Sequence, residues 1–159
     1  MRALLQRVRR AEVRVLPSDP GPPPQEAGDL IGRIGVGIVA LVGVSFEDTS
    51  EDARHLAQRL GHLRIFGDDS GRLNRSLLDV GGEVLSISQF TLYADVTGGR
   101  RPSFVRAAPP DVAEPLYLEF NRSLEAIGLR VVSGRFRAHM VVEIHNDGPV
   151  TILLDSRER

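Results

Sequence analysis

The sequence predicts an α+β domain made mostly of strands, in which about six or seven strands, most of them joined by hairpins, pack against two helices. Several segments alternate apolar and polar residues, as strands with one buried face do. Two longer segments place apolar residues three and four positions apart, as amphipathic helices do. The 159 residues, 42% of them hydrophobic and 26% charged, are enough for one domain with a sizeable core.

The N-terminal part of the chain predicts three strands and a loop. Met1–Val8 and Ala11–Val15 alternate apolar and polar residues, which indicates two half-buried strands. Residues 17–27 are rich in proline, which cannot donate to a β-ladder, so we expect an exposed loop there. Val36–Val44 is apolar almost throughout, as a strand buried on both faces is.

Two segments have the apolar spacing of a helix. Asp48–Ile65 is the first, with Thr49 as a candidate cap near its start. Pro110–Ile127 is the second, and it ends before Gly128, a residue type that often terminates helices. Between the two helices, Phe66–Ser76 contains turn residues and predicts a loop.

The remaining segments predict strands. Glu83–Tyr93, Leu129–Val132, Arg137–His145 and Val150–Leu154 are rich in apolar and β-branched residues. A tight turn at Asn146–Pro149 would join the last two strands into a hairpin.

The composition excludes several classes of protein. Without cysteine, the chain has no disulfides, thiolate metal sites or cysteine nucleophiles. No apolar stretch reaches the ~20 residues of a membrane span, and the N-terminus lacks the apolar core of a signal peptide, so we expect a cytoplasmic protein without a membrane partner. The net charge of −1 predicts no general attraction to nucleic acid. All 20 basic residues are Arg, however, and clusters of Arg suit either phosphates or solvated strand faces.

Three segments contain candidate site residues, and each also has a purely structural interpretation. Ser88–Thr91 lies where a strand turns from apolar to polar, as a strand that emerges at a cleft would, with alternate residues on opposite faces. Phe136 and Met140, near the start of a later strand, would either grip a flat ring or pack in the core. Pro149 precedes a strand, where it would either aim a backbone carbonyl or belong to an ordinary turn.

Two hydrolase hypotheses find little support in the sequence. Neither Ser88 nor Thr91 lies in a nucleophile elbow of the Gly-x-Ser-x-Gly type. His139, Glu143 and His145 would share a strand face and contribute to a metal site, but no second cluster of ligands accompanies them. We therefore expect no metal.

Short motifs, in order along the chain, resemble those of the D-aminoacyl-tRNA deacylases, once called D-tyrosyl-tRNA deacylases. The motifs are Met1–Val8, Ser88–Leu92, Arg101–Phe104, Gly134–Phe136 and Asn146–Thr151. The resemblance extends from the first residue to about position 154. Two segments depart from it: the loop at residues 17–27 is longer than expected, and residues 155–159 add a polar tail.

The resemblance implies a homodimer of small, barrel-like α+β subunits with a mostly antiparallel sheet, each a single domain over residues 1–159, with active sites at the subunit interface. It implies an enzyme without a cofactor that hydrolyses the ester between the terminal adenosine of tRNA and a D-amino acid or glycine. Such an enzyme spares L-aminoacyl-tRNA. The alternative, from a different class, is a non-catalytic tRNA-binding barrel.

The resemblance also assigns roles to residues. It implies that Gly148 and Pro149 form a Gly-cis-Pro motif, which one subunit inserts into the site of the other. The residues expected to line the catalytic pocket are Ser88, Gln89, Phe90 and Thr91. The residues expected near the substrate are Phe136, Ala138, Met140 and Asn146, with Arg7 and Arg101 at tRNA phosphates.

General chemistry explains why such residues suit this task. A rigid main chain would collide with an L side chain and accept a D side chain, and glycine has no side chain to collide, so glycyl-tRNA is expected as a second substrate. Backbone amides near Phe90 and Thr91 would stabilise the oxyanion. Thr91 has no evident general base, and the resemblance points instead to assistance by the 2′-hydroxyl of the terminal adenosine.

Overall fold

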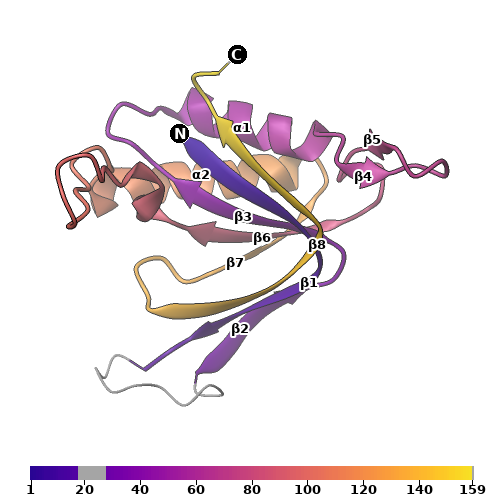
Figure 1. Ribbon diagram of the computed structural model, residues 1–159, viewed down its shortest axis with the longest axis horizontal. Coiled ribbons are helices and arrows are strands. Elements are labelled where there is room, and N and C mark those ends of the chain that lie inside the picture. Colours follow the sequence, from indigo (N-terminus) through magenta and orange to yellow (C-terminus); the bar gives the residue numbers. More distant parts are fainter. Residues whose placement is uncertain (18–27, 159) are drawn as a thin grey trace.

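The computed structural model describes residues 1–17 and 28–158, and its strands curl into a nearly closed barrel with both helices on one side (Figure 1). A six-stranded sheet has the order β2-β1-β3-β6-β7, with β8 also paired to β1. The first strand of this order, β2, also contacts β6 and β7, so the two ends of the sheet lie close together. The elements are β1 (Arg2–Val15), β2 (Asp29–Ile34), β3 (Gly37–Gly43), α1 (Ser50–His62), β4 (Phe66–Gly67), β5 (Leu73–Arg75), β6 (Glu83–Ser88), the 3-10 helix η1 (Phe90–Tyr93), α2 (Pro110–Ala126), β7 (Arg130–Ser133) and β8 (Met140–Asp155). Neither α1 nor α2 is long and apolar enough to cross a membrane.

The N-terminal strand β1 is longer than predicted. Met1–Val8 and Ala11–Val15 belong to a single strand of 14 residues and not to two strands. Its first half pairs with β3 and its second half with β2, while β8 follows it along both halves. The exposed Arg9 and Arg10, which interrupt the apolar alternation, lie at a register shift opposite β8 and not in a turn. Of the predicted proline-rich loop, Pro17 is exposed and residues 18–27 lie outside the described residues.

The sheet has an antiparallel part and a parallel part. β1 is antiparallel to β2, β3 and β8, which agrees with the expected mostly antiparallel sheet. β3, β6 and β7 run parallel to one another, so the expectation of hairpins there is wrong. The reason is that the connection from β3 to β6 includes α1 and the connection from β6 to β7 includes α2, and parallel neighbours require such crossovers.

Strand β8 takes the place of the two predicted C-terminal strands. The tight turn expected at Asn146–Pro149 is wrong, because the chain does not reverse there. Val8 pairs with Asn146 and Gln6 with Thr151, so the intervening residues bulge out of the ladder and β8 continues along β1. Both flanking segments had the pattern of strands, but the pattern did not reveal that they share one neighbour.

The predicted polar tail at residues 155–159 is partly packed against the rest of the protein. Asp155 is the last residue of β8 and forms an ion pair with Arg2, with 2.9 Å between Nε and Oδ2. Ser156 is buried, and its hydroxyl accepts a hydrogen bond of 2.7 Å from the amino group of Met1. The first two residues of the tail therefore fasten the two ends of the chain together.

Two other segments differ from the prediction. β6 ends at Ser88 and the chain then turns into η1, so Glu83–Tyr93 is not one strand, and the alternation of faces predicted over Ser88–Thr91 is wrong. Within Phe66–Ser76, β4 and β5 form a short antiparallel pair where only a loop was expected.

The two predicted helices are confirmed, and they cover the core. α1 and α2 contact each other, and residues of both helices pack in one hydrophobic cluster with residues of β1, β3 and β6. The fully buried members of their apolar stripes are Ala53, Leu56, Ala57, Leu60, Phe120 and Leu124.

The N-terminus of α1 gives a stability prediction that depends on pH. The amide and the hydroxyl of Thr49 both donate to Oδ2 of Asp52, at 2.8 and 2.7 Å. Burial opposes the charge of Asp52, but these hydrogen bonds outweigh it and lower the pKa of Asp52 from 3.8 to about 2. We expect Asp52→Asn to lower the free energy of unfolding by about 1 kcal/mol at pH 7.

Because the folded pKa of Asp52 lies below the unfolded one, its stabilisation is complete above pH 3.8 and is lost as the pH falls toward 2. The difference between wild type and Asp52→Asn, measured by urea denaturation, should therefore shrink at pH 2. An equal difference at pH 7 and pH 2 would contradict this explanation.

Candidate active site

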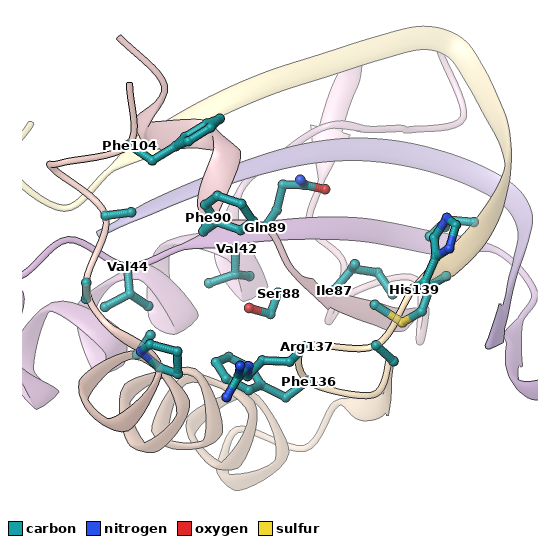
Figure 2. Close-up of a pocket in the computed structure, with 17 residues that line it drawn as sticks. Val42, Val44, Ile87, Ser88, Gln89, Phe90, Phe104, Phe136, Arg137 and His139 are labelled. Carbon is teal, nitrogen blue, oxygen red and sulfur yellow. The ribbon is translucent and has the colours of Figure 1, made fainter. Parts of the chain in front are cut away.

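A cavity of about 640 Å³ opens at the carboxyl ends of the parallel strands (Figure 2). Its walls come from the ends of β3 and β6, the start of η1, the start of α2 with the residues before it, and the loop between β7 and β8. Ligands in open α/β sheets bind at this edge, because the strands end there and the connecting segments diverge. The position alone therefore makes the cavity a candidate site.

The cavity brings together two of the three segments that contain candidate site residues. The expected residues that line it are Ser88, Gln89, Phe90, Phe136, Ala138 and Met140. Ser88 is the last residue of β6, and the amide of Gln89 donates to the carbonyl of Val42 at 2.7 Å, which holds this segment against the end of β3. The turn into η1 then carries Phe90 to the rim, where its side chain is 55% exposed.

The loop between β7 and β8 crosses closely over β6. A Cβ atom at Gly134 would lie 2.9 Å from Cδ1 of Ile87 and 2.9 Å from Sδ of Met140, so any side chain there would require Ile87 and Met140 to shift. Phe136 follows in this loop, with its ring centroid 6.1 Å from that of Tyr117. The hydroxyl of Tyr117 donates to the carbonyl of Ser86 at 2.8 Å and ties α2 to β6. Burial raises the pKa of Tyr117, so it stays a neutral donor.

Phe90 and Phe104 form a second aromatic wall. Their rings meet edge to face with centroids 5.0 Å apart, and both remain partly exposed. An exposed aromatic pair beside a cavity is suited to contact a flat ligand. From the sequence, Phe104 was only part of the Arg101–Phe104 motif, and no role was predicted for it. Sequence reasoning also missed the residues that the α2 end contributes, namely Ala107, Ala108, Pro110 and Ala113, because small apolar residues carry no chemical signal.

Thr91 lies beside the cavity and does not line it. Its side chain is exposed, and its Oγ1 accepts a hydrogen bond of 2.6 Å from Nε2 of Gln89. An amide is no general base, and within residues 1–17 and 28–158 no His, Asp or Glu side chain forms a hydrogen bond with Thr91. The arrangement orients the hydroxyl but does not activate it as a nucleophile.

Gly148 and Pro149 are exposed and lie outside the cavity of their own chain. The peptide bond between them is cis. Two neighbours hold this segment: Nδ2 of Asn146 donates to the carbonyl of Arg7 at 3.0 Å, and Nε of Arg7 donates to the carbonyl of Asp147 at 3.2 Å. The segment is thus a fixed, exposed feature on β8.

The two arginines expected at phosphates lie in different surroundings. The guanidinium of Arg7 also donates to the carbonyl of Ile65 at 2.5 Å, and its side chain is only 13% exposed. Nε and Nη1 of Arg7 therefore donate within the protein, and its contact with phosphate stays a prediction. Arg101 is exposed between η1 and α2, and its phosphate contact likewise stays a prediction.

The histidines of the metal hypothesis are separated. His139 lines the main cavity, whereas Glu143 and His145 line a second cavity of about 320 Å³ with Arg10 and Arg33. In the described part of the chain, no group of three or more His, Asp or Glu side chains is placed to hold a metal ion. The strand face predicted for the three residues is shared only by Glu143 and His145, because β8 begins at Met140 and His139 precedes it.

Known proteins resemble this chain over its whole length. Residues 4–155 match the family described as D-Tyr-tRNA(Tyr) deacylase. D-aminoacyl-tRNA deacylase from Thermus aquaticus is 50% identical over 159 residues, which are 100% of this chain and 97% of the relative. The enzyme of that name from Thermomicrobium roseum is 53% identical over 158 residues, 99% and 96% of the two chains. A solved structure described as c-Myc DNA unwinding element binding protein is 40% identical, with a TM-score of 0.85 over 98% of both chains.

Proposed function

This chain belongs to the D-Tyr-tRNA(Tyr) deacylase family and hydrolyses D-aminoacyl-tRNA, and from this premise we propose how its cavity performs the reaction. The aminoacylated 3′ end of the tRNA enters the cavity, with the terminal adenosine against Phe136, Ala138 and Met140. The ester then lies beside Ser88 and Gln89. The observation that supports this placement is that both sets of side chains line one cavity of about 640 Å³. Stacking of the base on an aromatic ring contributes about 1–3 kcal/mol. We place the reaction in the cytoplasm, where aminoacyl-tRNA is used.

Hydrolysis in this proposal relies on positioned neutral groups. Water adds to the ester carbonyl, and the backbone amides of Phe90 and Thr91 stabilise the oxyanion, since the first amides of a helix have no acceptor within it. The bond to the 3′-oxygen breaks, and this oxygen takes up a proton, which leaves free amino acid and tRNA. The neighbouring 2′-hydroxyl of the adenosine assists the proton transfers. Gln89 and Thr91 orient the water or the substrate through their 2.6 Å hydrogen bond.

A second copy of the chain completes the site in this proposal. Gly148 and Pro149 are exposed, held firmly by Arg7 and Asn146, and lie outside the cavity of their own chain. In a two-fold homodimer, this segment of one subunit enters the cavity of the other. There its main chain contacts the α-amino group of the substrate and excludes an L side chain. A site that contacts only the backbone atoms of the aminoacyl group has no means to reject glycine, so glycyl-tRNA is also a substrate.

The proposed mechanism predicts the behaviour of Thr91→Ala. We expect wild type to cleave D-Tyr-tRNA and spare L-Tyr-tRNA, and the variant to keep its single-turnover rate within about tenfold, because one neutral hydrogen bond contributes about 1 kcal/mol. The measurement is release of tyrosine from each charged tRNA in quench-flow experiments. A fall of the variant to the uncatalysed rate, with tRNA binding intact, would instead support Thr91 as a nucleophile. Binding of tRNA without cleavage by wild type would support the non-catalytic barrel.

A further inference from the structure

Arg137 has an unusual backbone conformation at the cavity. Among the residues that the structure describes, it is the one non-glycine residue with positive φ, at 62°. Glycine adopts this left-handed conformation without steric cost, whereas the Cβ atom of arginine crowds the following carbonyl. Non-glycine residues persist in this region where the surrounding structure enforces it, and they cluster at functional sites. The position therefore merits a functional explanation.

The side chain of Arg137 belongs to the cavity. It lines the wall between Phe136 and Ala138 and extends beside Phe136 toward the side that α2 forms (Figure 2). The residues that line this cavity include no Asp or Glu. Arg137 therefore places a cation at a wall whose other members are apolar or uncharged, apart from the imidazole of His139.

Within the part of the chain that the structure describes, the guanidinium of Arg137 has no partner. Several other arginines have a carboxylate partner, as Arg2 has in Asp155 and Arg54 in Glu119. Arg137 is exposed, and across residues 1–17 and 28–158 it forms neither an ion pair nor a side-chain hydrogen bond. A strained, unpaired arginine at an otherwise neutral cavity fits an anionic ligand, and the planar guanidinium suits phosphate.

We propose that Arg137 binds the phosphodiester that joins the terminal adenosine of the substrate to the preceding nucleotide. This inference rests on the proposed function, in which the adenine lies against Phe136. The 5′ phosphate is the anionic group next to the adenosine, and the residue that follows Phe136 is placed to reach it. Arg137 then secures the acceptor end, while the ester lies deeper, beside Ser88.

Substrates of increasing length test this contact. The D-tyrosyl ester of adenosine lacks the phosphodiester, the corresponding ester of cytidylyl-adenosine contains it, and D-Tyr-tRNA adds the rest of the acceptor end. We expect Arg137→Gly to raise KM about tenfold on the dinucleotide ester and on D-Tyr-tRNA, which corresponds to ~1.4 kcal/mol, with kcat unchanged. On the adenosine ester, KM and kcat should both stay at the wild-type values. The salt dependence of KM should weaken by about one phosphate contact.

Two further variants separate charge from backbone. Arg137→Lys keeps the cation and should retain part of the affinity, whereas Arg135→Ala removes an exposed arginine that does not line the cavity and should have no effect. Glycine suits the φ of position 137, so the Arg137→Gly variant is expected to fold.

Four results would overturn the proposal. These are an equal loss on the adenosine ester, a loss confined to full-length tRNA, no loss on any substrate, or the same loss in Arg135→Ala. If wild type cleaves none of the esters, the proposed function fails and this inference fails with it. That outcome is distinct, because it appears without any substitution.

Discussion

Replacement of Ala113 by Phe is expected to lower kcat/KM for D-Tyr-tRNA by about 100-fold or more, because it fills the space proposed for the terminal adenosine. Ala113 lies in the first turn of α2 and lines the cavity together with Phe136 and Ala138. A bulky ring on a helix has few ways to withdraw, and a displacement of about 1 Å at a reacting centre suffices for a 100-fold loss. The loss should also occur with the D-tyrosyl ester of adenosine, since the obstruction concerns the nucleoside and not the tRNA body.

A neighbouring substitution is the matched control for Ala113→Phe. Val112 precedes it on α2, is 38% exposed and does not line the cavity, so Val112→Phe adds an aromatic ring to the same helix outside the site. We expect this control to keep wild-type kcat/KM. Thermal unfolding of both variants separates obstruction from loss of folding. Full activity of a folded Ala113→Phe protein would show that the adenosine does not bind in this cavity.

The sequence was sufficient to predict the elements whose pattern of apolar residues is uninterrupted within one segment. The stripe that includes Leu56 and Leu60 and the stripe that includes Phe120 and Leu124 predicted both helices, and the apolar run at Val36–Val44 predicted β3. It was not sufficient for β1 and β8, because each contains bulges that interrupt the period of two. A bulge and a turn both appear as a break in alternation, and only the pairing along a shared neighbour distinguishes them.

The site was predictable only in part, for a related reason. Six of the expected residues were found from the pattern of their segments and from the resemblance to a known family, and the structure places them in one cavity: Ser88, Gln89, Phe90, Phe136, Ala138 and Met140. Phe104, Ala113 and Arg137 were missed, because tertiary structure alone brings their segments to the ends of the parallel strands. The left-handed backbone of Arg137 leaves no mark on the sequence at all.

The segment on β8 gives the second large prediction. Gly148 has a φ of 120°, and a Cβ atom there would lie 2.9 Å from Cγ2 of Val150 and 3.0 Å from Nη2 of Arg7. Gly148→Ala must therefore shift the exposed main chain that, in our proposal, distinguishes D-aminoacyl from L-aminoacyl substrates. We expect kcat/KM for D-Tyr-tRNA to fall about 100-fold. The preference for D-Tyr-tRNA over L-Tyr-tRNA should fall with it. Gly71→Ala is the control, because Gly71 also has positive φ, at 78°, but has open space around it and lies in the turn between β4 and β5.

A mixture of two inactive variants tests whether one subunit supplies this segment to the other. Gly148→Ala retains an intact cavity, and Ala113→Phe retains an intact segment, so neither homodimer has a complete site under the proposal. If the two chains are unfolded and refolded together in equal amounts, about half of the two-fold dimers are mixed and each mixed dimer contains one complete site, which restores about a quarter of wild-type activity. A chain whose own segment served its own cavity would gain nothing from the mixture, because every chain carries one defect. Restored activity therefore requires that Gly148 of one subunit act in the cavity of its partner, and an inactive mixture of folded dimers would refute the shared site.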